Sequence, residues 1–117
     1  MEVFKEFGVE CAHRFASHPD YEQIHGHSYI IEIRASGPID PAYGWVCDVA
    51  AIDAACADIR AALDHRYLNE IPGLECPTSE SMAVWIWTRL WLRVPMLSRV
   101  TIRVPSQSYG CSYEGPE

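Results

Sequence analysis

Two β-like runs that carry histidines at their adjoining ends constrain the fold of this chain most. Residues 2–15 and 25–36 are rich in β-branched and aromatic side chains, which is typical of strands. The second run opens with His25-Gly26-His27, and the first ends just after His13. Side chains two positions apart on a strand share a face. If the two runs pair as neighbours, three imidazoles converge on one point.

Three neutral imidazoles and one open position form the ligand set of a catalytic zinc site. Such a metal polarises oxygen atoms and acidifies the groups attached to them. An isolated His-x-His pair on a strand is more often a surface feature or a hydrogen-bonded pair. The additional histidine in the first run favours the metal, so the candidate zinc ligands are His13, His25 and His27.

Two helices are predicted in the middle of the chain. Apolar residues recur at three- and four-residue spacing from Val49 to Leu63, with Asp48 as the N-cap. A second helix is capped by Thr78 or Ser79 and runs to about residue 92. This second helix is apolar around most of its circumference. Such a helix is usually covered on more than one side, as it would be in an oligomer.

Two short strands, 99–104 and 109–114, are predicted to close the chain. The order β-β-α-α-β-β indicates an α+β fold: an antiparallel four-stranded sheet with both helices on one face. A length of 117 residues indicates a single domain over 1–117. The open edges of so small a sheet favour pairing with neighbouring subunits.

Composition excludes several classes of partner. A formal net charge of −7 argues against nucleic acid, whose phosphates require a basic face. The longest apolar stretch, around 82–92, is interrupted by Thr88 and Arg89 and is too short to span a membrane. Charged residues interrupt any apolar N-terminal segment. A reduced, cytoplasmic setting is therefore expected for the five cysteines, which form no Cys-x-x-Cys pair: Cys11, Cys47, Cys56, Cys76 and Cys111.

Five blocks, in order, carry a resemblance to a known family. The chain resembles the 6-pyruvoyl-tetrahydropterin synthase and 6-carboxy-tetrahydropterin synthase family, the latter being the queuosine-biosynthesis branch. The resemblance covers nearly the whole chain, from about residue 7 to residue 113. Its blocks are residues 12–15 (AHRF), 25–29 (HGHSY), 44–48 (GWVCD), 63–69 (LDHRYLN), and 77–80 (PTSE) with 84–87 (VWIW).

The resemblance implies the tunnelling fold, in which sheets from several subunits join into a barrel, usually as two stacked trimers. It implies a homo-oligomer with active sites at subunit interfaces and zinc on the three histidines. The implied substrate is 7,8-dihydroneopterin triphosphate or a related reduced pterin. The implied lyase chemistry is proton abstraction next to the ring, with loss of triphosphate or carbon–carbon cleavage.

The resemblance also gives roles to residues outside the zinc set. It makes His65 a proton shuttle and Asp64 the carboxylate that orients it. The alternative for this pair is a helix C-terminus, where the helix dipole favours a histidine. Thr78 and Ser79, at the start of the second helix, are candidate substrate-binding residues.

Two departures from the family pattern bear on function. The queuosine branch has a nucleophilic cysteine four residues before the first histidine of His-Gly-His, and this chain has Tyr21 there. Glu22 follows it, and the chain thus resembles a variant branch in which a glutamate replaces that cysteine and 6-hydroxymethyl-dihydropterin is released for folate biosynthesis. The alternative for Glu22 is a solvated loop carboxylate. Cys11 shares the face of His13, although a small buried filler is its more common role.

The second departure concerns the pterin anchor. The family holds the guanidine-like edge of the pterin with a glutamate near the end of the third strand, where this chain has Val104 or Pro105. Glu114 is the nearest downstream carboxylate and a candidate substitute; a solvent-exposed charge in the tail is the alternative. Two further hypotheses therefore stand beside the pterin lyase. One is a family member redirected to a non-pterin small molecule, and the other is a non-catalytic zinc-containing oligomer that binds a ligand.

Overall fold

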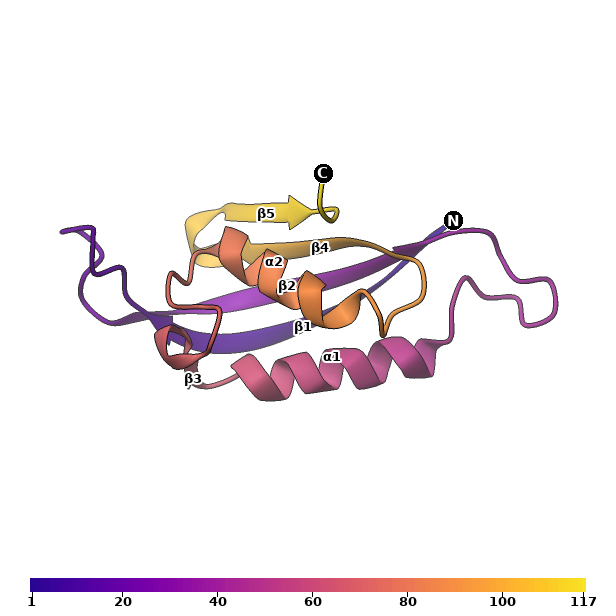
Figure 1. The fold of residues 1–117 in the computed structure, drawn as a ribbon, viewed down its shortest axis with the longest axis horizontal. Helices are drawn as coiled ribbons and strands as arrows, with labels where there is room; N and C mark the ends of the chain where they lie inside the picture. Colours follow the sequence, from indigo (N-terminus) through magenta and orange to yellow (C-terminus); the bar gives the residue numbers. More distant parts are fainter.

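The computed structural model describes all residues, 1–117, and shows an elongated α+β chain (Figure 1). Its extents are 55 × 25 × 24 Å. The strands are β1 (Glu2–His13), β2 (His25–Ser36), β3 (Arg66–Tyr67), β4 (Leu97–Val104) and β5 (Tyr109–Tyr113). The helices are α1 (Val49–Leu63) and α2 (Ser79–Leu90), with short 3-10 turns η1 (Leu68–Glu70) and η2 (Pro105–Gln107).

The strands form one sheet in the order β3-β1-β2-β4-β5. The β1–β2, β2–β4 and β4–β5 pairs are antiparallel, as predicted. The prediction of four strands is wrong, because β3 adds a fifth strand that runs parallel to β1. A two-residue strand has no periodicity to detect in the sequence. It forms where the chain leaving α1 passes the edge of β1.

Both helices pack on the same face of the sheet, which confirms the predicted layers (Figure 1). Alternate residues of the strands point into this layer, so that Ile31, Ile33 and Ile102 are fully buried together with Ile86 of α2. The opposite face of the sheet carries ion pairs such as Arg34–Glu32 (2.7 Å), Arg103–Glu6 (3.0 Å) and Arg99–Glu114 (2.7 Å). No helix in the chain has the length and apolar character needed to cross a bilayer.

The helix starts follow their capping residues. Asp48 accepts a hydrogen bond from the N–H of Ala50 at 2.9 Å, and Thr78 accepts one from the N–H of Ser81 at 3.0 Å. Helix α2 ends at Leu90, two residues before the predicted end. Other parts of the same chain cover much of the apolar surface of α2. Trp85, for example, is buried, and the guanidinium carbon of Arg89 lies 3.4 Å from the centre of the Trp85 ring.

Long loops lie at the two ends of the molecule. The loop 14–24 joins β1 to β2, and the loop 37–48 joins β2 to α1 at the opposite end (Figure 1). The antiparallel register of β1 and β2 runs from Glu2 opposite Ser36 to His13 opposite His25. The histidines therefore lie at the end of the sheet next to the loop 14–24.

Candidate metal and substrate site

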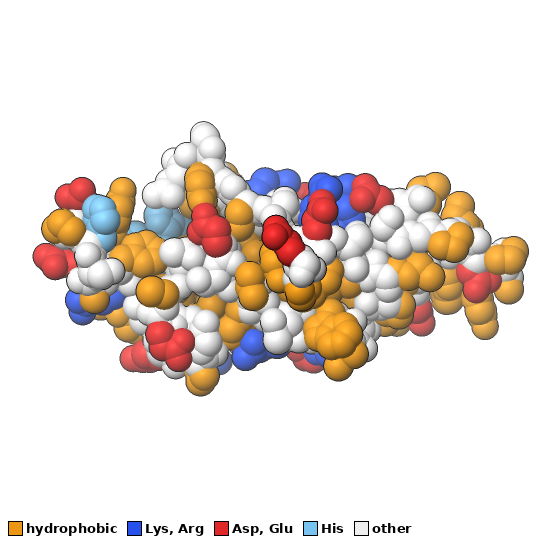
Figure 2. Space-filling model, turned by 45° about the horizontal axis from the view of Figure 1, so that its top comes forward, with side chains coloured by type: hydrophobic (Ala, Val, Ile, Leu, Met, Phe, Trp, Pro, Cys, Tyr) orange, Lys and Arg blue, Asp and Glu red, His pale blue; other side chains and the backbone are white.

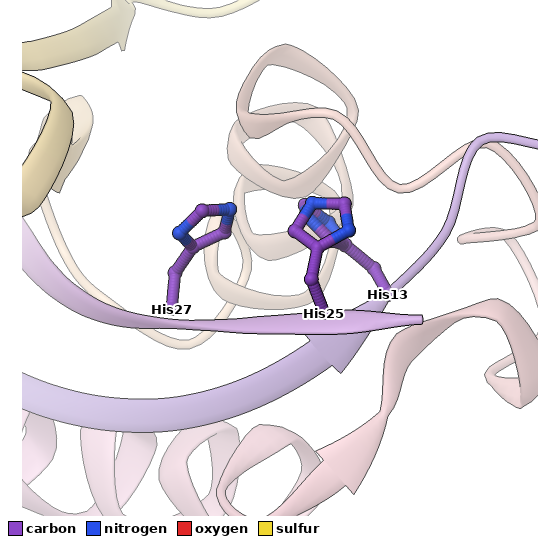
Figure 3. Close-up of side chains that lie close together, drawn as sticks. All are labelled: His13, His25 and His27. Atoms are coloured by element: carbon purple, nitrogen blue, oxygen red, sulfur yellow. The ribbon is translucent and has the colours of Figure 1, made fainter. Parts of the chain in front are cut away.

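Three imidazoles from two adjacent strands converge at one end of the sheet, as the sequence predicts. His13 is the cross-strand partner of His25, and His27 is opposite Cys11, two residues further along β2. All three rings rise from the face on which α2 lies (Figure 3). One ligand nitrogen from each lies within 4.8 Å of the other two, and the Nε2 atoms of His13 and His25 are 3.0 Å apart.

The Nδ1 contacts of two of these rings decide which nitrogens face inward. His13 Nδ1 lies 3.1 Å from the carbonyl oxygen of Pro77, and His25 Nδ1 lies 2.9 Å from that of Gln23. A carbonyl oxygen only accepts hydrogen bonds, so each Nδ1 carries the proton. In the neutral tautomer each Nε2 then presents a lone pair. Two lone pairs facing each other at 3.0 Å repel unless a cation lies between them.

A proton is a poor candidate for that cation near neutral pH. The side chain of His13 is buried, and this burial, with the nearby His25 and His27, lowers its pKa to about 4. Burial, and then the charge of His25, also lowers the pKa of His27. Neutral imidazoles with converging lone pairs are what a divalent metal such as zinc requires. The residues present therefore fit a metal ion.

We expect the metal-free protein to lose stability as the pH falls from 6.5 to 4. The pKa of His13 is about 4 in the folded chain against 6.5 as its ordinary value, so between these pH values the unfolded chain binds the proton and the folded chain does not. The free energy of unfolding should then fall by up to about 3 kcal/mol across this window. Urea denaturation at about pH 7 and about pH 4.5 measures the change.

Matched variants identify the group responsible for this pH dependence. His13→Gln should reduce most of it, leaving the smaller contribution of His27. His18→Gln, which alters an exposed imidazole of the loop 14–24, should retain the full pH dependence. An equal slope in His13→Gln and the parent would contradict the assignment.

The three histidines open onto a pocket of about 350 Å³. Figure 2 shows histidine side chains at the surface only at the end of the molecule that carries the loop 14–24. The predicted substrate-binding residues Thr78 and Ser79 line this pocket. The remaining lining residues are Phe15, Tyr21, Tyr29, Glu80, Val104, Gln107 and Tyr109.

Among the lining residues that were not predicted as site residues, Glu80 and Tyr109 form a hydrogen-bonded pair. Glu80 lies in the first turn of α2, and its carboxylate accepts a hydrogen bond from the hydroxyl of Tyr109 at the start of β5. This bond lowers the pKa of Glu80 and raises that of Tyr109. The only signal for Glu80 in the sequence was its place in the PTSE block, and nothing marked Tyr109.

Other predicted site residues lie elsewhere in the chain. Glu22 is exposed on the loop 14–24 and does not line the pocket, whereas the adjacent Tyr21 does. Glu114 pairs with Arg99 on the face of the sheet that is not covered by helices. Cys11 is a buried thiol that donates to the carbonyl of Leu63, and burial raises its pKa to about 12. Cys11 is therefore a packing residue in this chain and not a nucleophile.

Asp64 and His65 form a fixed pair at the edge of β1. The N–H of His65 donates to the carbonyl of Glu10 at 2.6 Å, and the N–H of Glu10 donates to Asp64 Oδ1 at 2.8 Å. The other carboxylate oxygen, Oδ2, lies 3.0 Å from His65 Nδ1 and 3.4 Å from the guanidinium of Arg60. The bond from Glu10, then the contacts with His65 and Arg60, lower the pKa of Asp64. The ionised carboxylate therefore holds the Nδ1 proton of His65 and leaves Nε2 free.

This pair does not enter the histidine pocket of its own chain. The imidazole of His65 is largely exposed and borders a second pocket, with Glu10 and Ser28 on the face away from the helices. His27 is the residue that borders both pockets. Within one chain, the converging histidine nitrogens and the Asp64–His65 pair therefore face different spaces.

Fold and site together define a small α+β protein with a triple-histidine centre beside a ligand-sized pocket. The sequence profile of the family described as 6-pyruvoyl tetrahydropterin synthase matches residues 2–116. This chain belongs to that family.

Individual relatives differ in their named activities. A 6-carboxy-5,6,7,8-tetrahydropterin synthase of Synechocystis sp. is 34% identical over 94 residues, which cover 75% of this chain and 73% of that protein. A dihydroneopterin monophosphate aldolase of Pyrococcus furiosus is 33% identical over 76 residues. That match covers 65% of this chain and 63% of the aldolase, so this chain spans less than two thirds of its length.

Solved structures share the fold. The structure of Caenorhabditis elegans 6-pyruvoyl tetrahydropterin synthase superposes with a TM-score of 0.86, covering 99% of this chain and 96% of that chain. The two chains are 22% identical, so this likeness shows the fold alone.

Proposed function

We propose that this protein is a cytoplasmic, zinc-dependent lyase that acts on the side chain of 7,8-dihydroneopterin triphosphate or a related reduced pterin. The observation that carries the proposal is the set of three converging imidazoles at a pocket of about 350 Å³. This volume falls in the range that small-molecule sites occupy. Membership of the pterin synthase family supports the choice of substrate.

His13, His25 and His27 would hold the zinc. Bound zinc would polarise oxygens of the substrate side chain and so acidify the neighbouring C–H and O–H groups. The carbonyls of Pro77 and Gln23 fix the tautomers of two of these rings, which keeps their Nε2 lone pairs directed at the metal position.

His65 would move the proton. Asp64 fixes its tautomer, and the free Nε2 would then accept a proton from the substrate or return one to it. Because His65 lies outside the histidine pocket of its own chain, a neighbouring subunit would supply it. This arrangement requires a homo-oligomer with shared sites, for which two stacked trimers are the expected form.

Glu22 is the second candidate base. No cysteine lines the pocket, and Tyr21 occupies the position expected for one. A carboxylate can take a proton but cannot act as a thiolate nucleophile. Glu22 is exposed on the loop 14–24, so it would reach the substrate only after the loop or a neighbouring subunit closes over the pocket. The aldolase named among the relatives is the activity that such a site would supply in folate biosynthesis.

Two alternatives rest on specific observations. A non-pterin ligand is favoured by the position of the family's anchoring glutamate, where Val104 borders the pocket and Pro105 offers no side-chain acceptor. A non-catalytic, ligand-binding role is favoured by the absence of a cysteine from the pocket.

Incubation of the zinc-loaded protein with dihydroneopterin triphosphate, followed by mass analysis, tests the proposal. We expect a pterin product that has lost either triphosphate or a glycolaldehyde-type fragment. The first outcome indicates a synthase and the second an aldolase. Binding without a product would support the non-catalytic alternative, and no binding would support a non-pterin ligand. A metal-free preparation should give no product and is the control.

A further inference from the structure

The histidine pocket has no cationic side chain that could bind a phosphate group. No lysine or arginine lines it, and its one acidic lining residue, Glu80, adds a negative charge. The chain as a whole carries a formal net charge of −7. Arginine and lysine side chains are the usual partners of phosphate oxygens in proteins. A side-chain cation for a phosphorylated substrate therefore has to come from another part of the oligomer.

Most cationic side chains of the chain are already engaged. Six of the nine lysine and arginine residues pair with carboxylates, and these are Lys5, Arg34, Arg60, Arg93, Arg99 and Arg103. A seventh, Arg89, stacks on the ring of Trp85. The remaining two are Arg14 and Arg66, and only Arg66 borders either pocket. Arg66 is therefore the one cation available to a ligand at either half of the proposed site.

Arg66 and His65 border the same pocket although they are consecutive in the sequence. This second pocket is otherwise lined by residues of β1, β2 and β3. Consecutive side chains of a regular strand point to opposite faces. His65 departs from that geometry because its φ is 58°, in the left-handed region that residues with a side chain seldom adopt. The turn at His65 thus brings an imidazole and a guanidinium to one space.

Hydrogen bonds to β1 hold His65 in this unfavourable conformation. Its N–H donates to the carbonyl of Glu10, and the N–H of Glu10 donates to Asp64. Strained backbone of this kind persists only where the surrounding structure enforces it, and it is concentrated at functional sites. The strain is accounted for if His65 and Arg66 act on the same ligand.

The guanidinium of Arg66 is not neutralised by its surroundings. Arg66 is exposed, and Glu10 is the one acidic residue that borders the same pocket. The carboxylate of Glu10 accepts a hydrogen bond from the hydroxyl of Ser28 at 2.7 Å and forms no ion pair with Arg66. A guanidinium offers five N–H donors in a planar fork, which matches two oxygens of a phosphate group.

We propose that Arg66 binds a phosphate group of the substrate beside the imidazole of His65. The inference rests on the proposed function, because the neighbouring subunit that supplies His65 supplies Arg66 with it. The ligand class is a phosphate ester whose ring lies in the histidine pocket of the other subunit. One guanidinium holds one phosphate group through paired hydrogen bonds, so a monophosphate already gains most of the affinity.

Binding of three ligands to the zinc-loaded protein tests this inference. The probes are 7,8-dihydroneopterin, its monophosphate and its triphosphate, and rapid-mixing fluorescence of the pterin measures binding before turnover. The parent should bind both phosphorylated ligands at least about tenfold more tightly than dihydroneopterin, because hydrogen bonds between charged groups are the strong ones. Arg66→Gln should remove most of this preference and leave the affinity for dihydroneopterin unchanged.

Three further variants complete the experiment. Arg93→Gln is the matched control: Arg93 pairs with Asp58 on the surface and lines neither pocket, so the phosphate preference should remain. Arg66→Lys keeps the charge but loses the paired donors, and it should retain part of the preference. Arg66→Glu should bind the phosphorylated ligands no better than dihydroneopterin, because like charges repel.

The outcomes separate this inference from the proposed function. If Arg66→Gln keeps the preference of the parent, or weakens all three ligands equally, Arg66 does not bind the phosphate and the inference is wrong. Equal affinity of the parent for all three ligands would also overturn it, while the pterin-binding function stands. If the parent binds none of the three, the proposed function fails, and the phosphate-binding role fails with it.

Discussion

His25→Ala should abolish stoichiometric zinc binding. His25 supplies one of the three converging nitrogens, and its Nε2 lies 3.0 Å from that of His13. Two histidines on β strands cannot complete the three-ligand set that catalytic zinc requires. Because loss of an outer-shell partner already costs about 10- to 100-fold in metal affinity, loss of a direct ligand should cost at least about 100-fold. Metal analysis of the purified, zinc-supplemented protein gives the zinc content per chain.

His18→Ala is the matched control for this experiment. It removes one of the five imidazoles, from the exposed loop 14–24, and should retain the full zinc content. The metal centre would be disproved by a parent protein that takes up no zinc, or by equal zinc contents in His25→Ala and the parent.

His65→Ala should reduce turnover by about 100-fold or more, the usual contribution of a positioned general acid–base group. Asp64→Asn should also lower turnover, since an amide no longer fixes the Nδ1 proton of His65. Asp58→Asn is the control, because Asp58 pairs with Arg93 on the surface and lies in neither pocket. Zinc content should be unchanged in all three variants.

Mixed oligomers test whether the site is shared between subunits. His25→Ala and His65→Ala should each be inactive alone, yet co-expression should restore activity. Each shared site needs the three histidines of one subunit and His65 of its neighbour. In randomly assembled oligomers about a quarter of the sites combine the two intact parts, so activity should be near a quarter of the parent value. Zero activity in the mixture would place both halves of the site in one subunit and overturn the shared arrangement.

Much of the fold follows from local sequence patterns. Period-two alternation places Ile31 and Ile33 on the buried face of β2, and capping residues define the starts of α1 and α2. The same period places His25 and His27 on one face, and the antiparallel register of β1 and β2 brings His13 opposite His25. The convergence of the histidines is thus determined by the sequence, because strand periodicity and neighbouring-strand pairing are local rules.

Other features depend on contacts between distant segments. Residues Arg66–Tyr67 become β3 only because β1 lies beside them. The pairing of Glu80 with Tyr109 joins residues 29 positions apart, and it exists because α2 packs over β4 and β5. The same packing leaves Glu114 on the opposite face of the sheet, paired with Arg99, so Glu114 as a substrate-binding residue stays a prediction that only another subunit could fulfil.

The sequence by itself determined the layers of this protein and the meeting of three histidines, since residue spacing alone decides which side of a strand or helix a side chain occupies. Only the tertiary structure decided which carbonyls orient the imidazoles, which carboxylate enters the pocket, and that His65 faces away from the three histidines of its own chain. These depend on how elements far apart in sequence are docked. Docking is governed by the shape of the whole core, which no short pattern of residues specifies.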